Sequence, residues 1–255
     1  MNVLPKKELG QHFLVDPNIL GVIGRLAELR ADDVVLEIGP GLGVLTRYHA
    51  ARVAHVHAVD LDASLEPRLR DAGANVTLHV GDALRLDLAA LAPGATKLVA
   101  NLPYNVATPL LVESLDGLPQ IGLWCVMVQR EVADRLFAVP QTKQYGAVSV
   151  LVQLVCGRSG FHPVSRTVFR PRPNVESALV AFRRVALPPG YADLKPLVVS
   201  AFAHRRKTLP NSLELAGLAS RAEAAEALET IGRDAATRAE ALAPAEFLAL
   251  AAALR

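Results

Sequence analysis

The stretch VVLEIGPGLGVLT, residues 34–46, predicts a buried strand, a glycine loop and the start of a helix. Glycine lets the backbone turn tightly and approach a ligand closely, and a helix N-terminus favours anionic groups. A purely structural turn is the alternative. A dinucleotide-binding loop that starts at Gly39 requires glycine at residue 44, where this chain has Val44. The loop instead places Gly39, Gly41 and Gly43 at every second residue, after Glu37.

Apolar runs alternate with helix-like segments on both sides of the glycine loop. They cover residues 34–38, 53–60, 75–82, 97–101, 121–129 and 147–156, with a possible seventh at 177–184. The runs are continuous rather than alternating, as in strands buried on both faces of a mostly parallel sheet. The intervals leave room for crossover helices such as 44–51 and 65–72. The predicted fold class is therefore α/β, with a Rossmann-like, doubly wound sheet.

The composition changes at Pro188-Pro189-Gly190, which cannot continue a helix or a central strand. Beyond it, apolar residues recur at helical spacing, and Ser220 and Pro244 stand where helix starts are expected. We predict a catalytic domain over residues 1–187 and a small helical domain over 188–255.

Polar side chains follow three of the predicted strands. Asp60 could accept hydrogen bonds from two ribose hydroxyls, and Asp82 could accept one from an adenine amine. Each could instead be a helix cap or a turn residue. Because strand ends of this kind form the ligand-binding edge of such sheets, we expect a nucleoside there. The Gly-x-Gly-x-Gly form is typical of methyltransferases that bind S-adenosylmethionine, with Gly39 and Gly41 beside the cofactor.

The tetrapeptide Asn101-Leu102-Pro103-Tyr104 follows the fourth predicted strand. An exocyclic adenine amine is a poor nucleophile, so a methyltransferase acting on it must hold both amine hydrogens. Asn101 can accept one and the Leu102 carbonyl the other, while Pro103 fixes the turn and Tyr104 stacks on the base. A base in folded RNA must first leave its stack. Phe169 is a candidate second stacking wall, with a core phenylalanine as the alternative.

The net charge is only +2, but the basic residues are clustered. Six arginines lie from residue 158 to residue 184, of which Arg170 and Arg172 closely follow the candidate wall and could hold phosphates. Further clusters are Arg205-Arg206-Lys207 and Lys6-Lys7. Each cluster alone could be a solvated surface, but three of them favour a polyanionic partner.

Composition excludes several classes of protein. With 255 residues, 51% hydrophobic and 20% charged, the chain can bury a sizeable core. No apolar run reaches the length of a membrane span, and the first residues lack a signal-peptide pattern. Cys125 and Cys156 lie in apolar runs, as expected of core thiols in a reducing compartment. We therefore expect a cytoplasmic protein without a metal site, and a monomer because no long heptad pattern is present.

The chain resembles the ribosomal RNA adenine N6,N6-dimethyltransferases, which modify two adjacent adenosines near the 3′ end of small-subunit rRNA. The resemblance rests on LGQHFLVD (9–16), LEIGPGLGVLT (36–46), NLPYNVATPLL (101–111), MVQREVADRL (127–136), FRPRPNVES (169–177) and AFAHRRKTLPNSL (201–213). It implies cofactor contacts at His12, Leu14, Gly39, Asp60, Asp82 and Asn101, and a base held by Asn101, Leu102, Tyr104 and Phe169.

The resemblance also implies an N-terminal segment, Gln11 to Phe13, that folds over the cofactor. It implies a C-terminal domain that helps dock the small ribosomal subunit, a role that Arg205, Arg206 and Lys207 fit. Two positions depart from the family pattern. Residue 12 is often asparagine in the family and is histidine here, and residue 60 is often glutamate and is aspartate here.

Two other functions remain as alternatives. One is a large-subunit rRNA adenine methyltransferase of the macrolide-resistance type, and the other is a non-catalytic RNA-binding relative. Leu102 and the arginine-rich stretch after Phe169 favour the small-subunit enzyme, and the intact loop and tetrapeptide argue against a non-catalytic relative. A nicotinamide-dependent oxidoreductase does not fit the glycine spacing.

Overall fold

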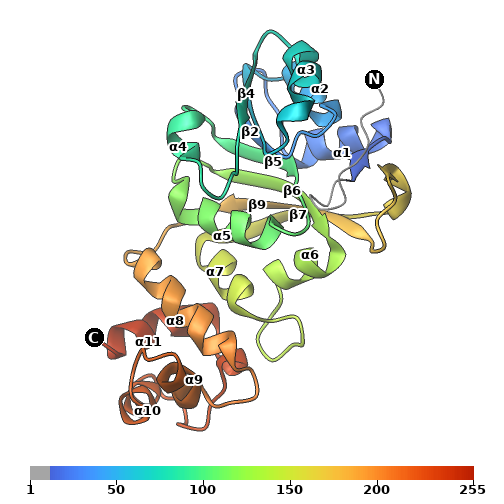
Figure 1. Ribbon diagram of the computed structural model, residues 1–255. Helices are drawn as coiled ribbons and strands as arrows, with labels where there is room; N and C mark the ends of the chain where they lie inside the picture. The colour runs from blue at the N-terminus through green and yellow to red at the C-terminus, as the bar shows by residue number, and fades with distance from the viewer. Residues whose placement is uncertain (1–11) are drawn as a thin grey trace. The chain divides into compact units, whose positions relative to one another are not determined.

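A computed structural model describes residues 12–255 (Figure 1). The chain forms two compact units, one up to Ala133 with Gly157–Arg184, and one of Asp134–Cys156 with Val185–Arg255. The predicted boundary at 187/188 differs from this division, because residues 134–156 make their contacts with the C-terminal helices. Lys6, Lys7 and Gln11 lie outside the described residues.

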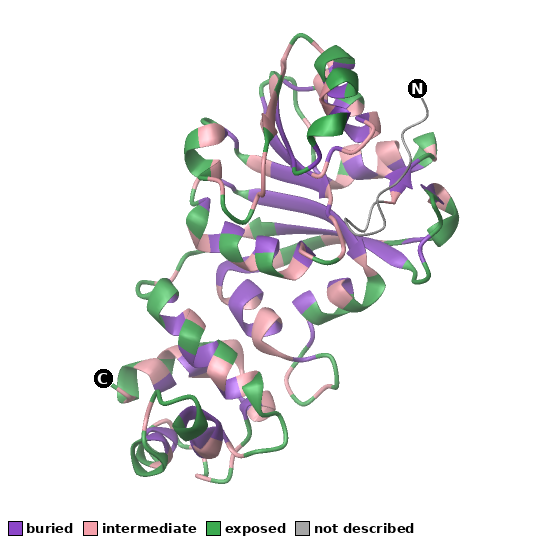
Figure 2. Cartoon of the chain, viewed as in Figure 1, coloured by how far each residue is buried: buried purple, intermediate pink, exposed green. Residues whose placement is uncertain are grey.

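The first unit is built on a sheet whose strand order is β4-β3-β2-β5-β6-β9-β7. The strands are β2 (Val34–Ile38), β3 (His55–Asp60), β4 (Val76–Val80), β5 (Lys97–Asn101), β6 (Leu123–Gln129), β7 (Cys156–Val164) and β9 (Ser177–Arg184). The five strands β2 to β6 are parallel, and β9 pairs antiparallel with β6. The central strands are buried (Figure 2), which accounts for their continuous apolar runs. The predicted α/β class is confirmed.

Short helices connect the strands of this unit. They are α1 (Pro17–Leu26), α2 (Val44–Ala50), η2 (Ala63–Leu65), α3 (Glu66–Leu69), η3 (Arg70–Ala72), α4 (Leu88–Leu91), α5 (Ala107–Gly117) and η4 (Arg166–Val168). The helix α6 (Arg130–Leu136) begins in this unit, and its last residues belong to the second. A separate antiparallel pair joins β1 (Phe13–Leu14) to β8 (Phe169–Arg170). The expected helix at 44–51 is confirmed, whereas the one at 65–72 is divided into short helical pieces.

The second unit is helical. It contains α7 (Ala147–Val155), α8 (Tyr191–Ala203), α9 (Leu209–Leu215), α10 (Arg221–Thr230), η5 (Ala239–Ala241) and α11 (Pro244–Ala253). Ser220 caps α10 in a capping box with Glu223, and Pro244 is the first residue of α11, as predicted. Between Pro17 and Ala253, no helix has the length and apolar character to cross a membrane.

The strand predicted at 147–156 is wrong, because these residues form α7. Val150, Leu151, Val152 and Val155 are all buried, and a helix covered on several sides gives the same apolar run as a central strand. Two buried tyrosines join α7 and the segment before it to the C-terminal helices. The Tyr191 hydroxyl donates to the Leu151 carbonyl at 3.2 Å, and the Tyr145 hydroxyl donates to the Leu242 carbonyl at 2.8 Å.

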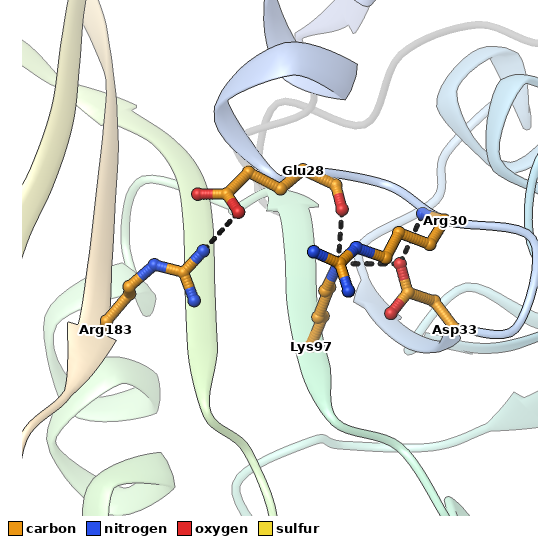
Figure 3. A network of polar contacts seen from close by, with 5 residues as sticks. All are labelled: Glu28, Arg30, Asp33, Lys97 and Arg183. Carbon is orange, nitrogen blue, oxygen red and sulfur yellow. Dashed lines mark hydrogen bonds and ion pairs between the residues drawn. The ribbon is translucent and has the colours of Figure 1, made fainter.

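A polar network closes the amino-terminal edge of the sheet (Figure 3). Lys97, the first residue of β5, donates to the Asp33 carboxylate at 2.6 Å and to the Glu28 carbonyl at 2.5 Å. The same Asp33 oxygen accepts from the Arg30 amide at 2.6 Å, and Arg183 pairs with the Glu28 carboxylate. The Lys97 and Asp33 side chains are only 12% and 10% exposed, so this ion pair is largely removed from water.

Candidate active site

The glycine loop lies at the carboxyl end of β2 and lines a pocket of this unit. Gly39, Gly41 and Gly43 have φ angles of 74°, 56° and 73°, in the left-handed region that favours glycine. A Cβ atom at Gly39 would lie 3.0 Å from the Pro103 side chain, and one at Gly41 would lie 3.0 Å from the Phe13 ring. The loop is therefore closely flanked by the tetrapeptide and by β1, and larger residues would disturb both contacts.

Asp60 ends β3 at the same edge and is 9% exposed. One carboxylate oxygen accepts from the Gly41 amide at 3.2 Å, and the other accepts from the Asp62 amide at 2.9 Å. Burial raises the pKa of Asp60, and the two backbone hydrogen bonds oppose that shift in part. Each carboxylate oxygen can accept more than one hydrogen bond, so Asp60 can fix the loop and still bind a ligand hydroxyl.

Asp82 follows β4 and also lines the pocket. Its carboxylate accepts from the Leu84 amide at 3.0 Å and lies 3.4 Å from Arg85. Asp82 is thus a turn residue that also lines the pocket, and its contact with an adenine amine stays a prediction. Leu61 and Leu84, which the sequence analysis did not single out, line the same pocket with 56% and 41% of their surface exposed. They offer apolar area for a planar group.

Asn101 ends β5 and carries an unsatisfied buried acceptor. Its Nδ2 donates to the His12 carbonyl at 3.2 Å, which fixes the orientation of the amide. Its Oδ1 is buried, and within residues 12–255 it has no hydrogen-bond donor. A buried acceptor without a donor costs about 1–3 kcal/mol. Because Asn101 lines the pocket, a ligand donor can satisfy this atom.

Tyr104 is held by two contacts, one at its hydroxyl and one at its ring. Its hydroxyl lies 2.5 Å from Ser177 Oγ, and burial raises the pKa of its phenol. Its ring centroid lies 5.6 Å from that of His12. His12 is itself fixed, because its Nδ1 lies 2.8 Å from the Pro171 carbonyl oxygen. A carbonyl oxygen only accepts, so Nδ1 carries the hydrogen.

The rest of the tetrapeptide is anchored in the protein. The Leu102 amide donates to the Met127 carbonyl at 3.1 Å, and the Leu102 side chain is buried. The Pro103 carbonyl accepts from the Val106 amide at 3.2 Å just before α5. The predicted residues His12, Leu14, Gly39, Gly41, Asp60, Asp82 and Asn101–Tyr104 all line one pocket.

Phe169 does not join them. It is 2% exposed and belongs to the hydrophobic core, where β8 places it opposite Leu14 of β1. In the structure Phe169 is thus a core residue that does not line this pocket, and its role as a second stacking wall stays a prediction. Arg170 and Arg172 are exposed, as a phosphate-binding role requires.

A buried contact between Glu37 and His49, next to the glycine loop, was missed from the sequence. Glu37, which precedes the loop and lines the pocket, lies 3.4 Å from Nδ1 of His49 on α2, and both side chains are almost fully buried. Nothing in the sequence pattern indicates His49, because a lone histidine on a helix can face either way. In the structure, His49 of α2 packs against Glu37 of β2, so it joins the two elements on either side of the glycine loop.

The basic cluster of the helical unit divides into two parts. Arg205 pairs with Glu240 at 3.2 Å and donates to the Lys143 carbonyl at 3.1 Å, so it stabilises its own loop. Arg206 and Lys207 are exposed beside it. No group of three or more histidine, cysteine or acidic side chains in the described chain is arranged to hold a metal ion.

The strand order and the position of the pocket at the carboxyl ends of β2, β3 and β5 define a Rossmann-like methyltransferase. Residues 3–255 match the family model described as ribosomal RNA adenine dimethylase, and the chain belongs to that family. The family predicted from the sequence is thereby confirmed.

Related proteins are similar in sequence to this chain over nearly its whole length. Ribosomal RNA small subunit methyltransferase A of Rubrobacter xylanophilus is 48% identical over 96% of this chain and 94% of its own length. The protein of the same name from Thermobifida fusca is 42% identical over 98% and 91%. Among solved structures, a dimethyladenosine transferase from Plasmodium falciparum has the same fold, with a TM-score of 0.76, 24% identity and coverage of 94% and 96%. The 23S rRNA methyltransferase ErmE has a TM-score of 0.63 at 26% identity, covering 95% and 99%.

Proposed function

We propose that this protein transfers methyl groups from S-adenosylmethionine to the N6 amines of two adjacent adenosines near the 3′ end of small-subunit rRNA. The observation that carries the proposal is the buried Oδ1 of Asn101, which has no hydrogen-bond donor among residues 12–255 and lies in a pocket shared with Tyr104. An adenine amine supplies the hydrogen that this oxygen lacks. The names of the relatives support the small subunit as the substrate.

The pocket fits the cofactor. Gly39 and Gly41 leave room for close backbone approach, Asp60 can accept from ribose hydroxyls, and Asp82 can accept from an adenine amine. His12 and Leu14 line the pocket near the loop. When bound, the cofactor supplies a methyl group on a positively charged sulfur.

The protein's own residues prepare the acceptor. Asn101 Oδ1 accepts one N6 hydrogen and the Leu102 carbonyl accepts the other, which draws the nitrogen toward tetrahedral geometry and exposes its lone pair. Tyr104 stacks on the base and fixes its plane. No general base is required, because the N6 proton becomes acidic on methylation and can leave afterwards. The rate gain comes from positioning and fixed dipoles.

Substrate affinity comes from outside the pocket. Arg170 and Arg172 near the catalytic site, and Arg206 and Lys207 in the helical unit, contact phosphate and dock the enzyme on the small subunit. Arg205 contributes by holding the loop that carries Arg206 and Lys207. The proposal includes a monomer acting in the cytoplasm, where the small subunit is assembled.

Replacing Arg206 and Lys207 together by alanine should weaken binding in a salt-dependent way. Each side chain that no longer neutralises a phosphate should reduce the slope of log K against log salt by about 0.7–0.9, so we expect a change of about 1.5. The measurement is a filter-binding titration of unmethylated small subunits over a range of salt concentrations. Arg70→Ala, which removes an exposed arginine already paired with Glu66, is the control and should leave the slope unchanged. A double variant with the wild-type slope would contradict the phosphate role.

Asp60→Ala should weaken binding of S-adenosylhomocysteine at least about tenfold, because charge-assisted hydrogen bonds to hydroxyls are removed.

The wild-type affinity for S-adenosylhomocysteine should also fall as the pH drops through the pKa of Asp60, since a protonated carboxyl accepts less well. Burial raises this pKa above the usual 3.8, so the decline begins at higher pH than for an ordinary aspartate. Calorimetric titrations from neutral to mildly acidic pH test both points. An unchanged affinity in the variant would refute the ribose contact.

The function itself is tested by methyl transfer from labelled S-adenosylmethionine. Unmethylated small subunits, unmethylated large subunits and bare rRNA are the three substrates, and digested nucleosides are separated by mass. We expect N6,N6-dimethyladenosine from small subunits alone. Label in large-subunit RNA would instead indicate the macrolide-resistance type. Cofactor binding without any label would indicate a non-catalytic RNA-binding protein.

A further inference from the structure

We propose that Ser177 is a positioning residue for the reaction, which fixes the Tyr104 ring through its hydroxyl so that the flipped base is presented to Asn101 in one orientation. The inference rests on the proposed function, because it assigns Tyr104 the base. It adds a residue on a different strand, 73 positions further along the chain than Tyr104.

Ser177 is a rigid anchor. It is the first residue of β9, is 1% exposed, and pairs with Gln129 of β6 in the antiparallel register. The preceding residue is held as well, because the Glu176 carbonyl accepts from the Arg130 amide at 2.9 Å. The Ser177 hydroxyl is therefore placed by the sheet and not by a loop.

Tyr104, in contrast, lies outside the sheet. It follows β5 in the turn before α5, and its side chain is half-buried. A tyrosine ring turns about two side-chain bonds, and packing against His12 at 5.6 Å restrains only one side of it. The hydrogen bond to Ser177, at 2.5 Å, fixes the far end of the ring. Burial raises the pKa of the phenol, so the phenol stays neutral, and either hydroxyl can donate in this bond.

The chain segment from Pro171 to Ser177 restrains Tyr104 in two ways. Ser177 contacts it directly, and Pro171 holds His12, which packs against the ring. This segment also carries Arg172 and follows Arg170, the two exposed arginines near the pocket. The ring is thus tied to the part of the chain that is proposed to contact RNA phosphate.

Ser177→Ala should lower kcat about tenfold, because the base then samples orientations in which its amine misses Asn101. The KM for small subunits should change less than about threefold, because subunit affinity comes mainly from phosphate contacts. Ser177→Thr keeps a hydroxyl and should recover most of kcat. Tyr104→Phe removes the partner hydroxyl and should lower kcat as much as Ser177→Ala.

The double variant decides between positioning and a general effect on folding. If Ser177 acts through the Tyr104 hydroxyl, Ser177→Ala should cost nothing further in the Tyr104→Phe background. Ser114→Ala is the matched control, because Ser114 is a buried serine that accepts from Trp124 at 2.9 Å. It should lower the unfolding temperature comparably but leave kcat within about twofold of the wild-type value. The inference would be overturned if the two substitutions lowered kcat multiplicatively in the double variant, or if Ser177→Ala alone kept the wild-type kcat.

A readout without substrate separates this inference from the proposed function. In protein labelled at its tyrosines, a slowly exchanging hydroxyl proton of Tyr104 should be visible by NMR and should vanish in both Ser177→Ala and Tyr104→Phe. If wild-type protein methylates no subunit, the proposed function fails while this signal still shows whether Ser177 holds the ring. A Tyr104 hydroxyl that exchanges freely in the wild type would refute the positioning role.

Discussion

Asn101→Ala is expected to lower kcat by about 1000-fold, the largest effect of any single substitution in this protein. Removing one preorganised polar contact at a reacting centre costs about 10²–10³ in kcat in other enzymes. Asn101 adds to this by fixing the base, because its amide is oriented by the His12 carbonyl. Single-turnover methylation of small subunits measures the decrease.

Folding and cofactor binding should largely survive this substitution. The change removes one hydrogen bond, from Nδ2, and also removes an acceptor that has no donor within the described residues of the unliganded protein. The two effects oppose each other, so the free energy of unfolding should change by less than about 1 kcal/mol. Asn18→Ala, an exposed asparagine on α1, is the control for residue type. Near-normal turnover in Asn101→Ala would remove the basis of the proposed mechanism.

Lys97→Met should lower the free energy of unfolding by about 3 kcal/mol, the largest effect on stability that we expect from removing a single charge. The substitution leaves Asp33 largely buried without its cation, and breaking such a pair from one side is strongly unfavourable. The Glu28 carbonyl loses its donor at the same time. Urea unfolding monitored by circular dichroism measures the change.

An exposed ion pair provides the contrast. Arg70 and Glu66 form an i, i+4 pair whose side chains are 72% and 40% exposed, so Arg70→Met should leave the unfolding midpoint almost unchanged. Equal effects of the two substitutions would contradict the role assigned to burial. Methyl transfer by Lys97→Met should persist below its unfolding midpoint, because Lys97 and Asn101 lie at opposite ends of β5.

The strands that carry the site could be predicted because they are short, continuous and followed by polar residues. The runs that lead to Glu37, Asp60 and Asn101 have the predicted type and nearly the predicted bounds. Parallel strands bring their carboxyl ends to one edge, so Gly39, Asp60, Asp82 and Asn101 could be grouped without any structure. His12 and Leu14 were implied only by the family resemblance.

Errors arose where a local pattern has two physical solutions. An apolar run such as 147–156 can be a central strand or a buried helix, and only its partners decide. β7 was missed because it lacks a continuous apolar run. Arg158 and Ser159 are exposed, and Gly157 and Gly160 interrupt the pattern. At Phe169 the sequence left a core role and a stacking role open, and the pairing of β8 with β1 buries the ring.

Interactions between distant residues could not be predicted at all. The bond from Ser177 to Tyr104 and the pairing of Arg205 with Glu240 depend on how strands and helices meet, and no spacing in the sequence encodes them.

The helical unit is assembled from two separate stretches of chain, and this affects how the protein is made. Residues 134–156 are synthesised before residues 157–184, which belong to the other unit, and only then do residues 185–255 follow. The apolar side of α7 therefore leaves the translating ribosome well before Tyr191 and α11 exist to cover it. At a synthesis rate of about 5–20 residues per second, this side remains uncovered for several seconds. During that interval the buried residues of α7 are without the later helices that pack on them in the folded unit.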